Sequence, residues 1–373
     1  MAEQTNISKM KVNEMISMMV PLIIGSKKGK ELPAVNLSGA PGVGKSDGVR
    51  AIAAAIQEKT GKKVYVHDVR LLNMNPVDLR GIPAKDTMNA KVEVDGKIVD
   101  ADVAVARWLR PAIFQMDPSP DVVNVLFLDE ITAAPQSVQA AAYQLVLDRK
   151  VGEHMLPDNT FVFCAGNRVG DKSVAYRMPK ALANRLCHLE IYADVDDWKS
   201  WAIEHGIDQR IIGFINFKRD SLFKFDPSND DLAYPTPRSW EMVDRFLKRI
   251  DNIDLCYPMI AGCIGNGAAT EFSGYTQVYQ QIPNVKDIFD GKKVEHPKKA
   301  DVCYALSSAI VNFAQTATEK QLAAMVSWTS EWSADFATVT IKDCVVNKDV
   351  KRKISRTDAW VQWAKKNRAF LDA

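Results

Sequence analysis

Two hydrophobic periodicities divide this chain of 373 residues. Up to about residue 193, short apolar runs of strand length alternate with stretches in which apolar residues recur at helical spacing. Beyond that point only the helical spacing continues. Alternating strands and helices are typical of a parallel sheet covered by helices, so the first part predicts an α/β domain. The pattern predicts three regions: an α/β domain over 1–193, an all-helical domain over 194–282 and a mostly helical C-terminal extension over 283–373.

A glycine-rich segment follows the first apolar strand, which we expect over 34–38. Its sequence, Gly39-Ala40-Pro41-Gly42-Val43-Gly44-Lys45-Ser46, matches G-x-x-x-x-G-K-[ST], the phosphate-binding P-loop. Apolar residues at helical spacing follow it, so a strand precedes the motif and a helix comes after it. A chance glycine-rich turn is the alternative, and these flanking elements disfavour it.

The P-loop predicts a site for ATP and Mg²⁺. Its backbone N–H groups wrap a triphosphate, which side chains at Gly42 or Gly44 would obstruct. Lys45 reaches the β and γ oxygens, and the Ser46 hydroxyl takes a place on Mg²⁺. The residues expected to bind the nucleotide are Gly39, Pro41, Gly42, Val43, Gly44, Lys45 and Ser46.

A second apolar strand, expected over 122–128, ends in the carboxylates Asp129 and Glu130. This is the Walker B arrangement, in which Asp129 holds the Mg²⁺ shell and Glu130 orients and polarises the attacking water. Many strands end in acidic turns, so the pair gains its meaning from the P-loop that precedes it.

Three further polar residues are candidates for the same site. Asn167 follows the strand expected over 160–165, where its amide could contact the γ-phosphate and the water, although an Asx turn is the alternative. Arg185 ends a short helix, where one subunit could offer a cation to its neighbour, although most such arginines form weak surface ion pairs. Arg238 follows Pro237 in the first turn of a helix, where its positive charge lies at the positive end of the helix dipole. A nearby phosphate would compensate for this repulsion, so the position favours a phosphate contact.

Two hairpins interrupt the α/β pattern. Asp95-Gly96 supplies a type I′ turn between the alternating segments of residues 91–99, and residues 150–157 form a shorter hairpin. Both are decoration or tools for contacting a partner. The first helix, expected over 8–24, should be interrupted near Pro21, and residues 351–371 read as one basic amphipathic helix.

Composition and charge limit the partners and the cellular compartment that we expect. The net charge is +2, without a strong nucleic-acid footprint, so we do not expect a nucleic-acid partner. The apolar run 15–25 is too short to span a bilayer and lacks the flanks of a signal peptide, so no membrane association is expected. The six cysteines show no zinc spacing and read as buried thiols of a cytoplasmic protein.

The P-loop, Asp129-Glu130, Asn167, Asn184-Arg185 and Pro237-Arg238, in that order, resemble the AAA+ ATPases, over residues 15–280. Within that class the chain is similar to the MoxR-like group. This likeness lies in the segment 75–81 before the first hairpin, the second hairpin before the sensor strand, and the segment 181–185. The resemblance implies that Asn167 is the first sensor, Arg185 the arginine finger supplied in trans, and Arg238 the second sensor on a helical lid. It also implies a ring, usually a hexamer, often beside a von Willebrand factor A-type partner.

The leading hypothesis is therefore an ATP-hydrolysing motor that assembles into a ring and remodels or activates a protein partner. A GTPase is disfavoured because Asn167-Arg168-Val169-Gly170 breaks the Asn-Lys-x-Asp motif. A nucleotide-gated structural ring or adaptor with slow hydrolysis is the alternative, and a DNA-acting motor, which should bind DNA in a salt-sensitive way, is a weaker third.

Overall fold

The computed structural model describes residues 7–171, 176 and 178–367. The chain forms two compact units, Met1–Tyr192 and Ala193–Ala373. The first is the α/β part and the second is helical among its described residues. The change in hydrophobic period near residue 193 therefore coincides with the boundary between the two units.

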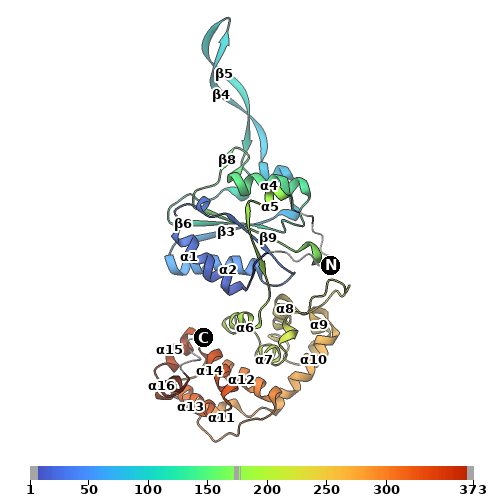
Figure 1. Cartoon of the computed structure of the whole chain (residues 1–373), viewed down its shortest axis with the longest axis vertical. Coiled ribbons are helices and arrows are strands. Elements are labelled where there is room, and N and C mark those ends of the chain that lie inside the picture. The colour runs from blue at the N-terminus through green and yellow to red at the C-terminus, as the bar shows by residue number, and fades with distance from the viewer. Residues whose placement is uncertain (1–6, 172–175, 177, 368–373) are drawn as a thin grey trace. The chain divides into compact units, whose positions relative to one another are not determined.

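A six-stranded parallel sheet forms the centre of the first unit (Figure 1). Its order is β1-β10-β2-β9-β6-β3, and every neighbouring pair runs parallel. The strands are β1 (Lys9–Met10), β2 (Ala34–Ser38), β3 (Lys63–Arg70), β6 (Val122–Asp129), β9 (Thr160–Gly166) and β10 (Leu186–Ile191). β9 is buried along its whole length, as a strand covered on both faces must be, which explains its continuous apolar sequence.

Helices cover both faces of this sheet. Figure 1 shows α1 (Val12–Gly25) and α2 (Lys45–Thr60) on one side, with α4 (Gln136–Asp148) and α5 (Lys180–Ala183) on the other. Shorter helices complete the unit: α3 (Pro76–Arg80), η1 (Gly29–Glu31), η2 (Leu71–Asn73), η3 (Ala112–Phe114) and η4 (Val169–Asp171). The expected fold class, a parallel-sheet P-loop core followed by helices, is confirmed.

The interruption expected near Pro21 is wrong, because α1 continues through this residue. Pro21 and Ser17 both lie on the exposed side of the helix. Proline has no N–H, so one helix carbonyl lacks its usual donor. Water can satisfy that carbonyl on the exposed side, so the helix tolerates the loss of one backbone hydrogen bond.

A long β-hairpin projects from the sheet (Figure 1). It consists of β4 (Ile82–Val94) and β5 (Lys97–Leu109), each 13 residues long. Asp95 and Gly96 join them with φ angles of 52° and 75°, as a type I′ turn requires. The expected hairpin is thus confirmed and is longer than residues 91–99. The second hairpin is also present, as β7 (Lys150–Val151) and β8 (His154–Met155).

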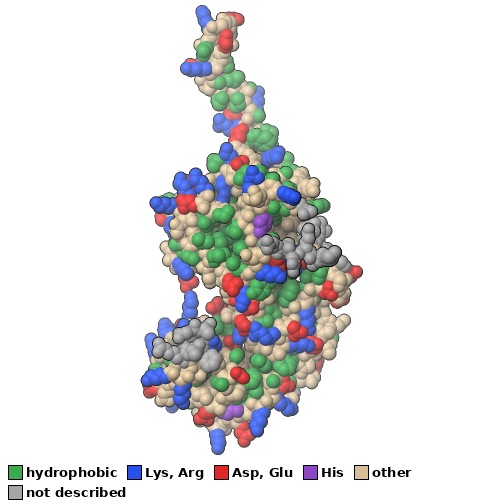
Figure 2. All heavy atoms as spheres, viewed as in Figure 1, with side chains coloured by type: hydrophobic (Ala, Val, Ile, Leu, Met, Phe, Trp, Pro, Cys, Tyr) green, Lys and Arg blue, Asp and Glu red, His purple; other side chains and the backbone are tan. Residues whose placement is uncertain are grey.

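The two faces of the long hairpin differ in polarity. Side chains alternate between the faces, and directly paired residues share one. One face, here called the apolar face of the hairpin, carries Ile82, Ala84, Met88, Ala90, Val92, Val94, Val99, Ala101, Val103, Val105 and Leu109, with one ion pair and Lys97. The other face is mixed and carries Lys85, Thr87, Asn89, Lys91, Glu93, Asp100 and Asp102 together with Pro83, Ile98, Ala104, Ala106 and Trp108. Five members of the apolar face are strongly exposed: Ile82 63%, Met88 46%, Val94 51%, Val99 41% and Leu109 59%. Figure 2 shows the hairpin with hydrophobic and charged side chains of both signs along it.

The second unit is built around one hydrophobic core. Its helices are α6 (Val195–Glu204), α7 (Gln209–Phe217), α8 (Pro237–Leu247), α9 (Ile253–Ile264), α10 (Asn266–Thr276), α11 (Val285–Phe289), α12 (Ala300–Ala314), α13 (Glu319–Ser330), α14 (Ala334–Cys344), α15 (Lys348–Ile354) and α16 (Asp358–Lys366), with η5 (Arg219–Leu222) and η6 (Gln277–Gln281). Trp240 of α8, Ile310 of α12 and Trp363 of α16 belong to the same buried cluster. Residues on both sides of position 282 therefore share this core.

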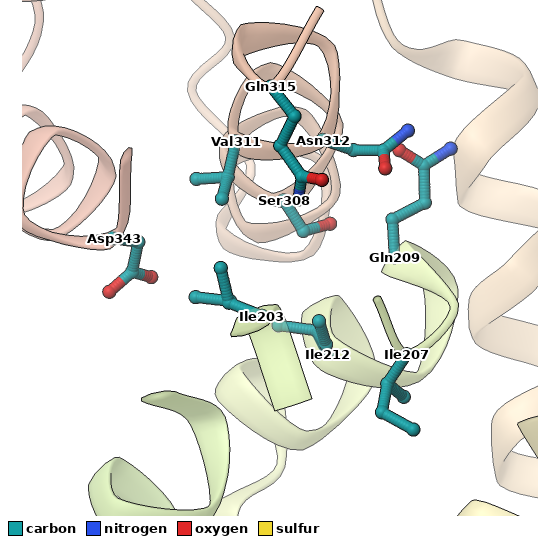
Figure 3. Close-up of a pocket in the computed structure, with 9 residues that line it drawn as sticks. All are labelled: Ile203, Ile207, Gln209, Ile212, Ser308, Val311, Asn312, Gln315 and Asp343. Atoms are coloured by element: carbon teal, nitrogen blue, oxygen red, sulfur yellow. The ribbon is translucent and has the colours of Figure 1, made fainter. Parts of the chain in front are cut away.

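α12 packs along α6 and α7 within this unit (Figure 3). A cavity of about 10 Å³ remains between Ile203, Ile212 and Val311, which is room for one water at most. Asp343 of α14 borders it and forms an ion pair of 2.9 Å with Lys199 of α6. This contact joins the first helix of the unit to one near its end.

The single basic helix expected over 351–371 is wrong. Two helices, α15 and α16, replace it as far as residue 367, and residues 368–371 lie outside the described part of the chain. The break falls at 355–357, where the Thr357 hydroxyl accepts a hydrogen bond of 3.3 Å from the N–H of Trp360. An N-cap thus starts a new helix where the apolar spacing alone suggested continuity.

Candidate nucleotide-binding site

Three strand ends meet at the carboxyl edge of the sheet. β9 lies between β2 and β6, so the P-loop that follows β2 and the acidic pair that ends β6 flank the residues that follow β9. The pairings Ser38 with Gly166 and Leu128 with Cys164 align the three ends. Open parallel sheets place ligands at this edge.

The glycines of the P-loop are there for conformation and for space. Gly42 and Gly44 have φ angles of 75° and 95°, in the left-handed region that glycine adopts most readily. A Cβ on Gly39 would lie 2.4 Å from the carbonyl oxygen of Ile191 in β10. The loop therefore packs closely on β10. At Gly42 and Gly44 it carries no side chain that could block its peptide groups.

Lys45 is buried among oxygen atoms at the first residue of α2. Its Nζ donates to the carbonyls of Gly39 (2.7 Å) and Ala40 (3.0 Å) and to Oδ1 of Asn167 (3.2 Å). Only 9% of the residue is exposed. An ammonium held in this way can exchange carbonyl oxygens for phosphate oxygens as a nucleotide enters.

Ser46 and Asp129 also lie in contact, as Oγ of Ser46 donates to Oδ2 of Asp129 at 3.1 Å. A hydroxyl and a carboxylate are hard oxygen ligands of the kind that Mg²⁺ prefers. The described residues contain no group of three or more His, Cys, Asp or Glu side chains placed to hold a metal. A two-residue set fits Mg²⁺, which usually takes its other ligands from water and substrate phosphates.

Glu130 follows directly on this metal-binding pair. Its φ angle is 59°, and its N–H donates to Oδ1 of Asp129 at 2.8 Å. Its carbonyl accepts from the N–H groups of Ala133 (3.0 Å) and Ala134 (3.1 Å). The residue is half-buried. The left-handed backbone ends β6 abruptly and turns the chain away, so the carboxylate stands at the edge of the sheet.

Asn167 contacts the P-loop through its side chain. Its Oδ1 accepts from Lys45, and its own carbonyl accepts from Oγ1 of Thr132 at 3.1 Å. The side chain is thus directed at Lys45, which is not the local contact expected of an Asx turn. Next to it, Arg168 forms ion pairs with Asp171 (2.9 Å) and Glu190 (3.1 Å). Burial lowers the pKa of the Arg168 guanidinium, but its bonds to these two carboxylates outweigh that effect and raise it.

Arg185 is exposed and lies in the same unit. Its Nη1 donates to the carbonyl of Ala181 at 2.7 Å, and its guanidinium carbon lies 5.0 Å from the ring centroid of Tyr143. This contact with the ring face is of the cation–π kind and holds the side chain at the surface. No contact with Lys45, Ser46, Asp129 or Asn167 is among its described interactions.

Arg238 belongs to the second unit, as the second residue of α8. Thr236 caps this helix by accepting from the N–H of Ser239 at 3.0 Å, and Pro237 occupies the first turn, as the sequence indicated. The Arg238 side chain is exposed. The structure thus brings Lys45 into contact with Asn167 and Ser46 into contact with Asp129, with Glu130 next in the chain. Arg185 is not among their described contacts, and Arg238 belongs to the second unit.

Sequence reasoning missed Thr132 and Arg168. Both touch the segment that carries Asn167, one through a hydrogen bond and the other as its neighbour in the chain. A threonine two residues after a strand-end glutamate has no motif of its own. Arg168 could have been noticed only because it follows Asn167.

A groove in the second unit is lined by residues other than those of the predicted site. A groove of about 580 Å³ lies in the second unit, beside the junction of α9 and α10, and carries none of the predicted site residues. Among the described residues, no helix has both the length and the apolar character needed to cross a bilayer. The six cysteines are free, and five of them are buried or half-buried.

No family model and no curated protein matches this chain. Several solved structures resemble it. A putative ATPase from Cytophaga hutchinsonii is 14% identical over 84% of this chain and 78% of its own, with a TM-score of 0.32. A mutant of RuvB from Thermotoga maritima is 14% identical over 82% and 86% of the two chains, with a TM-score of 0.32. The ORC2 protein of Aeropyrum pernix, in ADPNP–ADP complexes, is 10% identical over 78% and 75%, with a TM-score of 0.37.

Scores this low carry no argument about function, so the fold is defined by the chain itself. A P-loop follows β2, β9 separates β2 from the acidic strand β6, and β10 lies on the other side of β2, with β1 beyond it at the edge. This is a parallel-sheet P-loop fold followed by a helical unit.

Proposed function

We propose that this protein is an ATP-hydrolysing AAA+ motor of the MoxR-like kind, which assembles into a ring, as a homo-hexamer, and works in the cytoplasm. The observation that supports hydrolysis most is the meeting of Lys45, Ser46, Asp129 and Asn167 at one sheet edge. Parallel strands bring their carboxyl ends to one edge in any case, but an ammonium, a hydroxyl, a carboxylate and an amide in contact there match what a bound triphosphate requires.

Each residue has a distinct part in this chemistry. ATP would supply the phosphoryl group to be transferred and Mg²⁺ would neutralise its charge. Lys45 leaves the carbonyls of Gly39 and Ala40 for phosphate oxygens, while Ser46 and Asp129 hold the cation. The Glu130 carboxylate would accept a proton from the attacking water as the new P–O bond forms and the bond to the bridging oxygen breaks, which releases ADP and phosphate. The amide of Asn167 orients that water.

Arg185 completes the site from a neighbouring subunit in this proposal. Its exposure supports this role, since a finger that serves another subunit must stand at the surface. A cation supplied in trans raises turnover by ~10³ or more in related phosphoryl transfers. Arg238 contacts the phosphates from the helical lid as the second sensor.

The decisive experiment mixes two inactive variants. Lys45→Ala removes the phosphate contact but keeps Arg185, and Arg185→Ala keeps the nucleotide pocket but lacks the finger. We expect each alone to lose about 10³-fold or more in turnover. Mixed assemblies should recover a substantial fraction, because some interfaces pair an intact pocket with an intact finger.

Arg107→Ala is the matched control, as Arg107 is also an exposed arginine of the first unit, paired with Asp86 on the long hairpin. It should hydrolyse ATP like the wild type. Mixtures that stay inactive although light scattering shows mixed rings would refute a finger supplied in trans.

The partner of this motor is proposed as a protein, with a von Willebrand factor A-type protein as its adaptor. A Glu130→Gln ring, loaded with ATP, should hold that client for identification. A client that binds equally without ATP would contradict a nucleotide-driven cycle.

A nucleotide-gated adaptor with slow hydrolysis is the second candidate, and the apolar face of the hairpin favours it. A projecting ribbon with several exposed apolar side chains fits a docking surface more directly than a catalytic one. If Glu130→Gln binds ATP and still supports the biological task, the adaptor replaces the motor.

A further inference from the structure

Glu130 and Asn167 lie on two turns that are joined to each other. The N–H of Ile131, next to Glu130, donates to the carbonyl of Ala165 at 2.9 Å. One residue further on, Oγ1 of Thr132 donates to the carbonyl of Asn167 at 3.1 Å. The turn after β6 is thus fastened at two points, one at the end of β9 and one at the residue that follows this strand.

Gly166 makes the second contact possible. A Cβ on this residue would lie 2.5 Å from Oγ1 and 2.8 Å from Cγ2 of Thr132. Its φ angle is not among the positive ones, so glycine is needed here for space and not for conformation. Thr132 therefore packs directly onto the peptide that precedes Asn167.

These contacts hold Asn167 through both its main chain and its side chain. Thr132 fixes its main chain, and Lys45 fixes its side chain through a bond of 3.2 Å. We propose that Thr132 is a positioning residue for hydrolysis, which sets the separation between the Glu130 carboxylate and the Asn167 amide so that one water is held between them. This inference rests on the proposed function.

A purely structural Thr132 predicts something different. In that case losing the hydroxyl would lower stability, or nucleotide binding and turnover together. A positioning residue instead affects turnover selectively, because ATP is bound by the P-loop whether or not the water is correctly placed. The separation of kcat from KM therefore distinguishes the two roles.

Thr132→Val tests this directly, since it keeps the shape of the side chain and removes its donor. We expect kcat to fall about 10- to 100-fold, the range for a small misplacement of reacting groups. The Kd for ATP, KM and Tm should stay close to wild type. Thr132→Ser, which keeps the hydroxyl, should retain kcat to within about threefold, and Thr87→Val on the long hairpin is the matched control for the same chemical change.

Gly166→Ala provides an independent test that does not require Thr132→Val to fold. Its methyl group displaces the Thr132 hydroxyl, so kcat should fall in the wild-type background. In a Thr132→Ala background the same change should cost much less, because the contact is already gone. Additive losses in this cycle would overturn the inference.

The outcomes also separate this inference from the proposed function. A Thr132→Val variant with wild-type kcat, or one in which kcat and ATP binding fall together, overturns the positioning role alone. A wild-type ring that binds ATP and never hydrolyses it overturns the proposed function, and the positioning role with it.

Discussion

Glu130 combines a strained backbone with the side chain that we expect to act as the base. Its φ of 59° lies in the left-handed region, which costs an L-residue other than Asn or Asp about 1 kcal/mol. The turn is held by the bond to Asp129 and by the two bonds that its carbonyl accepts. Strain of this kind persists where the surrounding structure fixes it, often at functional sites.

Glu130→Gly should therefore stabilise the protein and inactivate it at once. Glycine relieves the backbone strain but adds freedom to the unfolded chain, so the net gain should be about 0.5 kcal/mol, or a rise of 1–2 °C in Tm. Glu130→Gln should lose hydrolysis equally without gaining stability. Calorimetry on both variants checks this, and a Gly variant less stable than the Gln variant would contradict it.

Arg149, in contrast to Glu130, is a half-buried charged residue whose contacts stabilise the fold. Its guanidinium donates to the carbonyls of Gly29 (3.2 Å), Leu32 (3.0 Å) and Thr160 (3.2 Å), so it ties the segment before β2 to β9. Burial lowers the pKa of this guanidinium, and the nearby Cys164 opposes that effect. Its hydrogen-bond partners are backbone oxygens, of which the carbonyl of Gly29 also accepts from the N–H of Leu32 at 3.3 Å.

Arg149→Met should cost about 3 kcal/mol of unfolding free energy, because it removes three hydrogen bonds to backbone carbonyls. Arg149→Lys should recover only part of that loss, since one ammonium cannot reproduce a planar fork of donors. Urea unfolding measures both. A Met variant as stable as wild type would show that water replaces the guanidinium without cost.

The sequence predicted those site residues that come at strand ends, such as Asp129 and Asn167. Their placement follows from one rule, that parallel strands bring their carboxyl ends to one edge. The contact between Thr132 and Asn167 could not be predicted, because it depends on the exact approach of two turns that lie 35 positions apart in the chain.

At the scale of elements, the long hairpin was recognised only around its turn. Residues 91–99 alternate clearly, whereas the stretch from Lys85 to Asn89 mixes charged, polar and apolar side chains and gives no strand signal. Pairing with β5 is what extends the strand through that stretch. The break between α15 and α16 was missed for a similar reason, since one capping residue outweighs the apolar spacing.

A shortened hairpin tests what this element does. Residues 86–105 can be replaced by Asp-Gly, which moves the existing turn down to the directly paired residues Lys85 and Ala106. We expect ATP turnover and Tm to stay unchanged, because the removed residues belong to the projecting part of the hairpin and pair with each other. Binding of the protein partner should be lost.

The control for this experiment keeps the length and changes one face. Met88→Glu puts a charge on the apolar face of the hairpin, whereas Thr87→Glu puts it on the other face. Only the first should weaken partner binding in a pulldown. Equal effects of both would argue that charge, and not the apolar face, controls the interaction.

At the scale of the whole molecule, the second unit has a core that runs across its length. Trp240, Ile310 and Trp363 share this core although they lie far apart in sequence. A division of this region at residue 282, as the hydrophobic pattern suggests, would cut through it. The pattern could not show this, because amphipathic spacing reveals that a helix has a buried face but not which helix covers it.

The fragment 193–373 should therefore fold by itself, whereas 193–282 should not. The shorter piece loses α12 and exposes the apolar residues of α7 that pack against it. Circular dichroism and a cooperative thermal transition test both fragments. A cooperative transition in 193–282 would show that the lid has a sufficient core of its own.

The ion pair between Lys199 and Asp343 predicts a pH dependence of this unit. Burial raises the pKa of the Asp343 carboxyl, and Lys199 opposes that effect. Lys199→Met removes the opposing charge, so the pKa in the folded state rises further above its unfolded value. A group of this kind stabilises the fold below its unfolded pKa, and that stability is lost as the pH rises through the folded pKa.

Lys199→Met should thus be destabilised by about 3 kcal/mol at pH 7 and markedly less at pH 5. Asp343→Asn, which cannot ionise, should lack this difference. Denaturant unfolding at both pH values checks the sign, and a Met variant that is more stable at pH 7 than at pH 5 would reverse the assignment.

The close contact between Gly39 and the carbonyl of Ile191 has a mechanical consequence. Ile191 ends β10, and α6, the first helix of the second unit, begins at Val195. The P-loop thus contacts the backbone of Ile191, just before the chain passes into the second unit. A nucleotide that displaces this loop would therefore act directly on the backbone at the end of β10, without an intervening side chain.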